Sequence, residues 1–128
     1  MIAIDTNVLV RLIVEDNDIQ ARKALKFLEK HSEAFISAIV ICEAAWVLES
    51  CYEFKKEVLV NVFENILRVD QFFIEHSEQI WVALNEYKKF NIDFSDCVIA
   101  AIAKLNDCDF VATFDKKAAK SQLFELIK

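Results

Sequence analysis

The sequence predicts an α/β fold in which helices cover both faces of a central parallel sheet of four to five strands. Short apolar runs of strand length alternate along the chain with longer segments whose apolar residues recur at helical spacing. This alternation implies right-handed crossovers between parallel strands and a three-layer α/β/α arrangement. The 128 residues, of which 55% are hydrophobic, suffice for one core, so we expect a single domain over residues 1–128.

The chain contains neither glycine nor proline. Phosphate-binding loops of the Walker type, the G-x-G-x-x-G dinucleotide motif and the G-x-S-x-G nucleophile elbow all need glycine where the backbone turns sharply or approaches a ligand. The composition therefore excludes these nucleotide-dependent enzymes and hydrolases.

The four cysteines form no C-x-x-C pair, and the two histidines, His31 and His76, lie far apart in the sequence. This spacing argues against zinc and indicates buried thiols in a reducing compartment. The chain opens without a basic segment and has no apolar run of membrane-spanning length, so we expect a cytoplasmic protein that does not contact a membrane. A formal net charge of −6 argues against a broadly nucleic-acid-coating surface but allows a local basic patch.

The first apolar run, residues 1–4, is expected to form a buried strand that stops at Asp5. Ligands bind beyond the carboxyl ends of parallel strands, so this acid is placed for chemistry. The alternative is that Asp5 only caps the helix expected over 6–14. A turn at 15–18 and an amphipathic helix over 19–30 follow.

A second strand is expected over 34–36, with Ser37 as the N-cap of a helix over 38–48. This helix is apolar at every position except Glu43, so we expect it to be buried with one carboxylate inside it. A buried carboxylate is costly unless it is paired or binds a metal, although Glu43 could also face solvent through a gap. A helix over 53–69 and a strand over 71–74 come next.

In the C-terminal half, Ser77 is a candidate cap for a helix over 78–90. A nearly wholly apolar helix then covers 97–103, preceded by Asp93 and Ser95 as credible caps. Asp96 is therefore not needed for capping and is expected in the first turn of this helix, where it could also simply favour the positive helix end.

The run 109–115 repeats the opening pattern, because an apolar strand again terminates at an acid, Asp115. A basic turn with three lysines and a last edge strand over 124–127 complete the chain. The two strand-end acids are thus expected at the same edge of the sheet.

Four acids stand out by position, and only the fold can gather them: Asp5, Glu43, Asp96 and Asp115. Gathered carboxylates repel one another and are tolerated chiefly when a divalent cation neutralises them, and hard Mg²⁺ or Mn²⁺ prefers oxygen ligands. Such a site can activate water and stabilise an in-line phosphoryl displacement, which is the chemistry of a nuclease.

These residues resemble the PIN domains, and specifically the toxins of VapBC-type toxin–antitoxin pairs. Together with similar length and element order, the resemblance covers essentially the whole chain. The matching blocks are Ile2 to Leu9, Ser37 to Glu43, Asp93 to Ala101, and Val111 to Asp115. The chain departs from the family pattern in lacking glycine, including before Asp96, where many relatives carry one.

The resemblance implies a Mg²⁺- or Mn²⁺-dependent endoribonuclease with a 3-2-1-4-5 parallel sheet, held inactive by a cognate antitoxin and expected as a homodimer. Asp5 and Asp96 match the principal metal ligands, Glu43 a ligand or an orienter of the water, and Asp115 a ligand of a second or outer metal. The matching polar supports are Thr6, Asn7 and Thr113. Contacts to RNA phosphates are considered for Arg11, Lys116, Lys117 and Lys120, which could equally be hydrated surface charges.

Two other functions compete with the ribonuclease. One is a non-catalytic module that binds a protein partner or RNA and whose acids act as caps or docking groups. The other is a phosphatase or receiver-like protein, but its Asp-x-Asp pattern fails because Asn7 stands where the second Asp is needed.

Overall fold

The structure is a computed structural model that describes residues 1–14 and 19–128. The chain divides into two compact units, Met1–Glu75 and His76–Lys128, and each is described by itself. The turn expected at 15–18 lies outside the described residues. In the described part of the chain no helix is long and apolar enough to cross a membrane.

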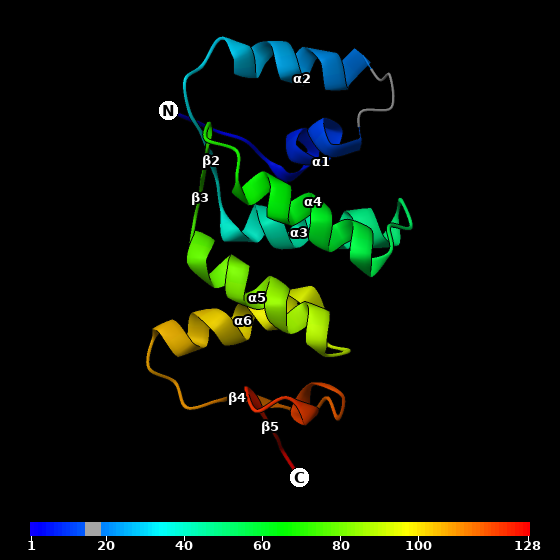
Figure 1. Cartoon of the computed structure of the whole chain (residues 1–128), viewed down its shortest axis with the longest axis vertical. Coiled ribbons are helices and arrows are strands. Elements are labelled where there is room, and N and C mark those ends of the chain that lie inside the picture. Colours follow the sequence, from blue (N-terminus) through cyan, green and yellow to red (C-terminus); the bar gives the residue numbers. More distant parts are fainter. Residues whose placement is uncertain (15–18) are drawn as a thin grey trace. The chain divides into compact units, whose positions relative to one another are not determined.

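The first unit is built around a three-stranded parallel sheet in the order β1-β2-β3 (Figure 1). The strands are β1 (Ile2–Ala3), β2 (Ala34–Ile36) and β3 (Phe72–Ile74), with Ile2 paired to Ala34 and Ala34 paired to Phe72. Its helices are α1 (Thr6–Val14), α2 (Ile19–Glu29), α3 (Ala38–Ser50) and α4 (Lys56–Leu67). Helix α1 packs against both α2 and α3, and α4 packs against α3 and β3.

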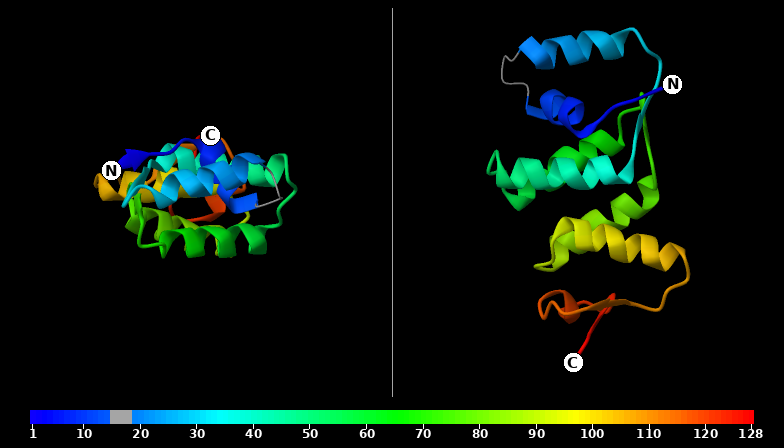
Figure 2. Two further views of the ribbon diagram at one scale, coloured as in Figure 1. Left: turned by 90° about the horizontal axis from the view of Figure 1, so that it is seen from above. Right: turned by 180° about the vertical axis from the view of Figure 1, so that it is seen from behind.

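The second unit holds two helices and a two-stranded parallel sheet. Helices α5 (Ser77–Lys89) and α6 (Phe94–Leu105) lie side by side, as Figure 2 also shows. Strands β4 (Val111–Thr113) and β5 (Phe124–Leu126) pair with Val111 opposite Phe124, and a short 3-10 helix, η1 (Ala118–Lys120), lies between them.

The predicted α/β fold with parallel strands is confirmed, and the orders 3-2-1 and 4-5 both occur. The five strands form two sheets instead of the single sheet that was expected. Each strand is only two or three residues long, because the chain turns into a helix or loop directly after it. Strands of two or three residues form few inter-strand hydrogen bonds, and this limits the extension of each sheet.

Each unit has its own apolar interior. The largest fully buried side chains of the first unit are Leu9, Ile36, Ile41, Leu48 and Phe63, and those of the second are Ile80, Leu84 and Cys97. The expectation that the cysteines are buried holds for Cys97 only, since Cys42 is half-buried and Cys51 and Cys108 are exposed.

Three helix starts differ from the prediction, and one of them is that of α6, which begins at Phe94 and not at Cys97. Helix α4 begins at Lys56 and not near Glu53, because Glu53 adopts a left-handed backbone with φ of 57° after α3 has ended. Ser77 is not the N-cap of α5, since His76 takes that position with φ of 54° and makes no side-chain capping bond. A non-glycine residue in the left-handed region interrupts a helix.

Helix α3 is not buried on all sides, which corrects the expectation of a carboxylate enclosed in apolar surroundings. Ile39 is 68% exposed and Trp46 is 62% exposed, and Glu43 is exposed as well. These three residues share one face of the helix, since they are spaced four and three apart. The cost of burying a lone carboxylate therefore does not apply to Glu43.

Candidate active site: two pairs of carboxylates

Asp5 caps helix α1. Its Oδ1 accepts a hydrogen bond of 3.0 Å from the backbone N–H of Val8, and its carbonyl accepts one of 3.2 Å from Leu9. The capping interpretation is thus confirmed as local structure. Among the described residues, none donates a hydrogen bond to Oδ2, so this exposed carboxylate has an oxygen available for a further partner.

Glu43 is joined to the turn that holds Asp5. The hydroxyl of Thr6 donates a hydrogen bond of 3.2 Å to Oε2 of Glu43, across the contact between α1 and α3. Because Thr6 follows Asp5 directly in the chain, this bond brings the first two acids of the predicted set to one place in the first unit.

The start of α3 is fixed by two side chains, of which only Ser37 was predicted from the sequence. Ser37 caps the helix as expected, since its Oγ accepts a 3.2 Å hydrogen bond from the N–H of Val40. Glu75, which directly follows β3, accepts a 3.0 Å hydrogen bond from the N–H of Ala38 through Oε1. Its signal in the sequence is an apolar strand that stops at an acid, the same pattern that singled out Asp5.

Asp96 and Asp115 interact electrostatically in the second unit. Asp96 lies in the first turn of α6, as predicted. Burial, then the negative charge of Asp93 and then that of Asp115, raise the pKa of the Asp96 carboxyl above its usual value. Asp93, which the sequence analysis considered only as a cap, is therefore a third member of this acidic group.

Asp115 has the same local role as Asp5. Its Oδ1 accepts hydrogen bonds from the N–H groups of Lys117, at 2.8 Å, and Ala118, at 3.4 Å, and so fixes the turn that begins η1. Thr113 accepts a 3.0 Å hydrogen bond from the N–H of Asp115. Both strand-end acids thus organise the backbone that follows them.

The basic side chains considered for RNA binding lie in both units of the chain. The Arg11 guanidinium donates a 3.4 Å hydrogen bond to the hydroxyl of Tyr52 and, together with Asn7, lines a cavity in the first unit. The three lysines of the basic turn are exposed, namely Lys116, Lys117 and Lys120.

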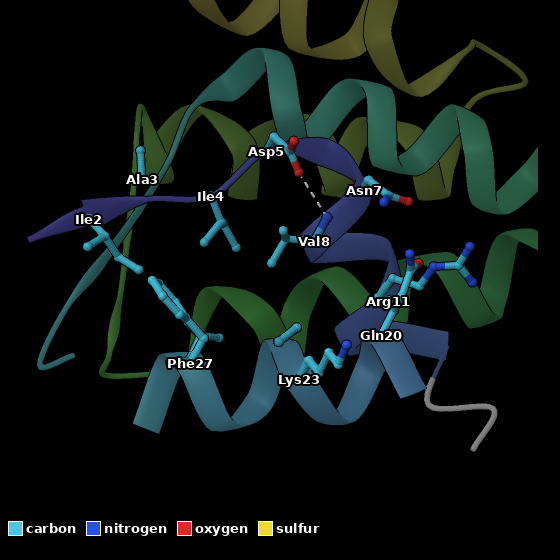
Figure 3. A pocket seen from close by; sticks show the side chains of 12 residues that line it. Ile2, Ala3, Ile4, Asp5, Asn7, Val8, Arg11, Gln20, Lys23 and Phe27 are labelled. Atoms are coloured by element: carbon cyan, nitrogen blue, oxygen red, sulfur yellow. Dashed lines mark hydrogen bonds between the residues drawn. The ribbon is translucent and has the colours of Figure 1, made fainter. Parts of the chain in front are cut away.

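This cavity of about 510 Å³ opens beside Asp5, between the β1 segment, α1 and α2 (Figure 3). Asp5 and Asn7 are among its lining residues, together with Lys23 and Phe27 of α2. Asp5 thus borders a space large enough for a small organic ligand.

The donor set suits a hard divalent cation, since all four predicted ligands are carboxylates. Among the described residues, no three or more His, Cys, Asp or Glu side chains are arranged as a ready metal site. The structure brings Asp5 and Glu43 together in the first unit, and Asp96 and Asp115 together in the second. Burial contributes most to the raised pKa of Asp96, and the negative charges of Asp93 and Asp115 add a repulsion that a bound cation would relieve.

Comparison with known proteins shows the family. The model of the PIN domain matches residues 2–121, so this chain belongs to the PIN domain family. A VapC ribonuclease of Aquifex aeolicus (strain VF5) is 29% identical over 92 residues, which cover 72% of this chain and 68% of that protein. The chain is thus distantly homologous to VapC ribonuclease toxins.

A similar solved structure is that of Mycobacterium tuberculosis VapC20, a toxin that cleaves the sarcin-ricin loop. It is 18% identical, with a TM-score of 0.47, and the alignment covers 94% of this chain and 95% of that one.

Proposed function

We propose that this PIN domain is a Mg²⁺- or Mn²⁺-dependent endoribonuclease that acts in the cytoplasm as the toxin of a type II toxin–antitoxin pair. The observation that carries the proposal is the family match over residues 2–121, a range that includes all four candidate acids. The similarity to a VapC ribonuclease supports RNA as the substrate.

The local geometry within each unit supports a metal-binding role for the acids of that unit. Asp5 keeps one carboxylate oxygen for a partner while the other caps α1, and Thr6 ties Glu43 to the same turn. In the second unit, Asp96 carries a raised pKa beside two further carboxylates. Side chains that repel one another without a cation are typical of divalent-metal sites.

The proposed roles are those implied by the resemblance of these residues to the PIN family. Asp5 and Asp96 would be the principal ligands, Glu43 would be a further ligand or would orient the attacking water, and Asp115 would bind a second or outer metal. When bound, Mg²⁺ or Mn²⁺ supplies Lewis-acid stabilisation of the charge that develops on the phosphodiester during hydrolysis. The hydroxyl of Thr6 would keep Glu43 in one orientation, and Thr113 would do the same for the backbone of Asp115.

Positive side chains would hold the RNA backbone. Arg11 lines the cavity beside Asp5, and the lysines of the turn after Asp115 are exposed and accessible to phosphates. We further propose that residues 1–128 act as one PIN-like domain. A cognate antitoxin would be the inhibiting partner, and the protein would form a homodimer.

A second candidate is a catalytically inactive PIN module that binds a protein partner or RNA. One observation favours it: Asp5 and Asp115 both serve as backbone caps, which is a sufficient structural reason for an acid at each position.

Cleavage of a total-RNA pool by the pure protein separates the two candidates. The ribonuclease proposal expects fragments with Mn²⁺ and none with EDTA, with product ends that map to defined positions. Intact RNA under both conditions, from a protein that shows a cooperative thermal transition, would leave only the binding module.

A further inference from the structure

The cavity beside Asp5 has two chemically different ends. In Figure 3 the side chains of Ile2, Ile4 and Phe27 gather at one end, and those of Arg11 and Lys23 lie toward the other. Phe27 is 55% exposed, and its ring stacks at 4.7 Å between centroids, tilted by 38°, against that of His31. One end is therefore aromatic and apolar, and the other is cationic.

The charge at the cationic end of the cavity is opposite in sign to the net charge of the whole chain. The protein has a formal net charge of −6, yet the cavity lining includes two cations, Arg11 and Lys23, and Asp5 is its only acid among the described residues. A local excess of positive charge in an acidic protein favours an anionic ligand.

One face of α2 supplies a polar, a charged and an aromatic side chain to the cavity. Gln20, Lys23 and Phe27 are spaced three and four apart, so they lie on the same side of the helix, and all three line the cavity. A polar amide, an ammonium group and an aromatic ring are thus presented in a row opposite the turn that carries Asp5.

We propose that this cavity is a nucleotide subsite for single-stranded RNA, an inference that rests on the proposed ribonuclease function. The base of the nucleotide next to the scissile bond stacks on Phe27, and its phosphate lies near Lys23 and Arg11. A nucleotide has the same two-ended character as the cavity, and about 510 Å³ lies within the range of small-ligand sites. Base stacking on aromatic side chains with positive charge along the backbone is the usual mode of single-strand binding.

Binding of a short fluorescein-labelled single-stranded RNA to the full chain, measured by anisotropy in EDTA over a series of salt concentrations, tests this subsite. Lys23→Gln is expected to weaken binding about fivefold at about 0.1 M salt and to lower the salt slope by about 0.7, the value for one lost phosphate contact. Lys26→Gln is the matched control, because Lys26 is an exposed cation of the same helix that does not line the cavity. It should change neither quantity by a comparable amount.

Phe27→Leu is expected to weaken binding at least about fivefold with an unchanged salt slope, because it removes stacking and leaves the charge. Phe27→Tyr, which keeps the ring, should restore the affinity. Circular dichroism of each variant shows whether the fold is intact, and the comparison of Lys23→Gln with Lys26→Gln decides the question if the leucine variant unfolds.

Cleavage with Mn²⁺, measured in parallel, distinguishes the failure of the subsite from the failure of the ribonuclease. Equal RNA affinities for Lys23→Gln and Lys26→Gln, together with Mn²⁺-dependent cleavage by the wild type, would overturn the subsite alone and leave the cavity to a peptide partner. Weakened binding by Lys23→Gln without any cleavage by the wild type would support the subsite as an RNA-binding site and overturn the ribonuclease. Wild-type protein that neither binds nor cleaves RNA would overturn both.

Discussion

The hydroxyl of Thr6 donates a 3.2 Å hydrogen bond to the carboxylate of Glu43, a residue 37 positions further along the chain. This bond links the turn after β1 to the exposed face of α3 and so connects two of the four predicted ligands. The Glu43 side chain is exposed, and this bond from Thr6 holds its carboxylate toward the turn after β1.

Replacing Thr6 tests whether this bond matters for cleavage. Thr6→Val removes the donor while keeping the shape of the side chain, and we expect a loss of RNA cleavage of about tenfold, typical of groups that orient a metal-site ligand. Thr6→Ser keeps the hydroxyl and should retain most of the activity. Equal rates for the two variants would show that the bond is only structural.

Asp5 combines a cap with a proposed ligand, and two substitutions separate these roles. Asn caps a helix about as well as Asp, so Asp5→Asn should leave the free energy of unfolding nearly unchanged while it abolishes cleavage. Asp5→Ala should also abolish cleavage and in addition destabilise the protein by about 1 kcal/mol. Urea unfolding in EDTA measures the stability term, and an active Asp5→Asn variant would show that Asp5 is only a cap.

The raised pKa of Asp96 predicts that removing its charge stabilises the protein, whereas Asp5→Ala is expected to destabilise it. Because the pKa in the folded state lies above the usual value of 3.8, ionisation of this carboxyl destabilises the fold as the pH rises above that value. In EDTA at pH 7, Asp96→Asn should therefore raise the melting temperature. The corresponding gain in the free energy of unfolding should be less than about 1 kcal/mol, because the carboxyl group is partly exposed and its charge is screened by solvent.

This gain should shrink as the pH falls from 7 towards 3.8 and should vanish below 3.8, where both the folded and the unfolded protein hold the proton. Asp109→Asn, a change at an exposed residue of the same unit, serves as the control for net charge. A melting temperature that Asp96→Asn lowers at pH 7 would contradict the account that burial and the neighbouring acids disfavour the charged form of Asp96.

Because Ser37 and Glu75 both cap α3, replacing either residue should lower the free energy of unfolding. Ser37→Ala should destabilise the protein by about 1 kcal/mol, because the N–H of Val40 loses its acceptor. Glu75→Gln keeps an oxygen acceptor for Ala38 but removes a charge that favours the positive helix end, so a smaller loss of about 0.3 to 1 kcal/mol is expected. Thermal unfolding of the single and double variants measures these terms, and a Ser37→Ala variant as stable as the wild type would contradict the assignment of the cap.

Local patterns in the sequence predicted much of the fold. The helix from Thr6 to Val14 and the strand from Ala34 to Ile36 have the bounds that apolar spacing and cap residues indicate. Ser37 and Asp5 cap their helices as expected, because capping depends on residues only three or four apart.

Features that depend on tertiary surroundings were not predicted. The apolar composition of α3 suggested burial on all sides, but Ile39 and Trp46 remain exposed, since periodicity does not show how many elements are available to cover a helix. The role of Glu75 was missed because its partner, Ala38, lies 37 residues away. His76 was not expected in a left-handed conformation, which its sequence neighbours do not reveal.

The most direct test of the central claim is a calorimetric titration of the metal-free protein with Mn²⁺, combined with RNA cleavage by the same samples. We predict that the wild type binds Mn²⁺ and cleaves RNA only when the metal is present, and that Asp5→Asn and Asp96→Asn each lose both properties while keeping a cooperative unfolding transition. Unchanged Mn²⁺ affinity and unchanged cleavage in these two variants would contradict the claim that their carboxylates hold the catalytic metal.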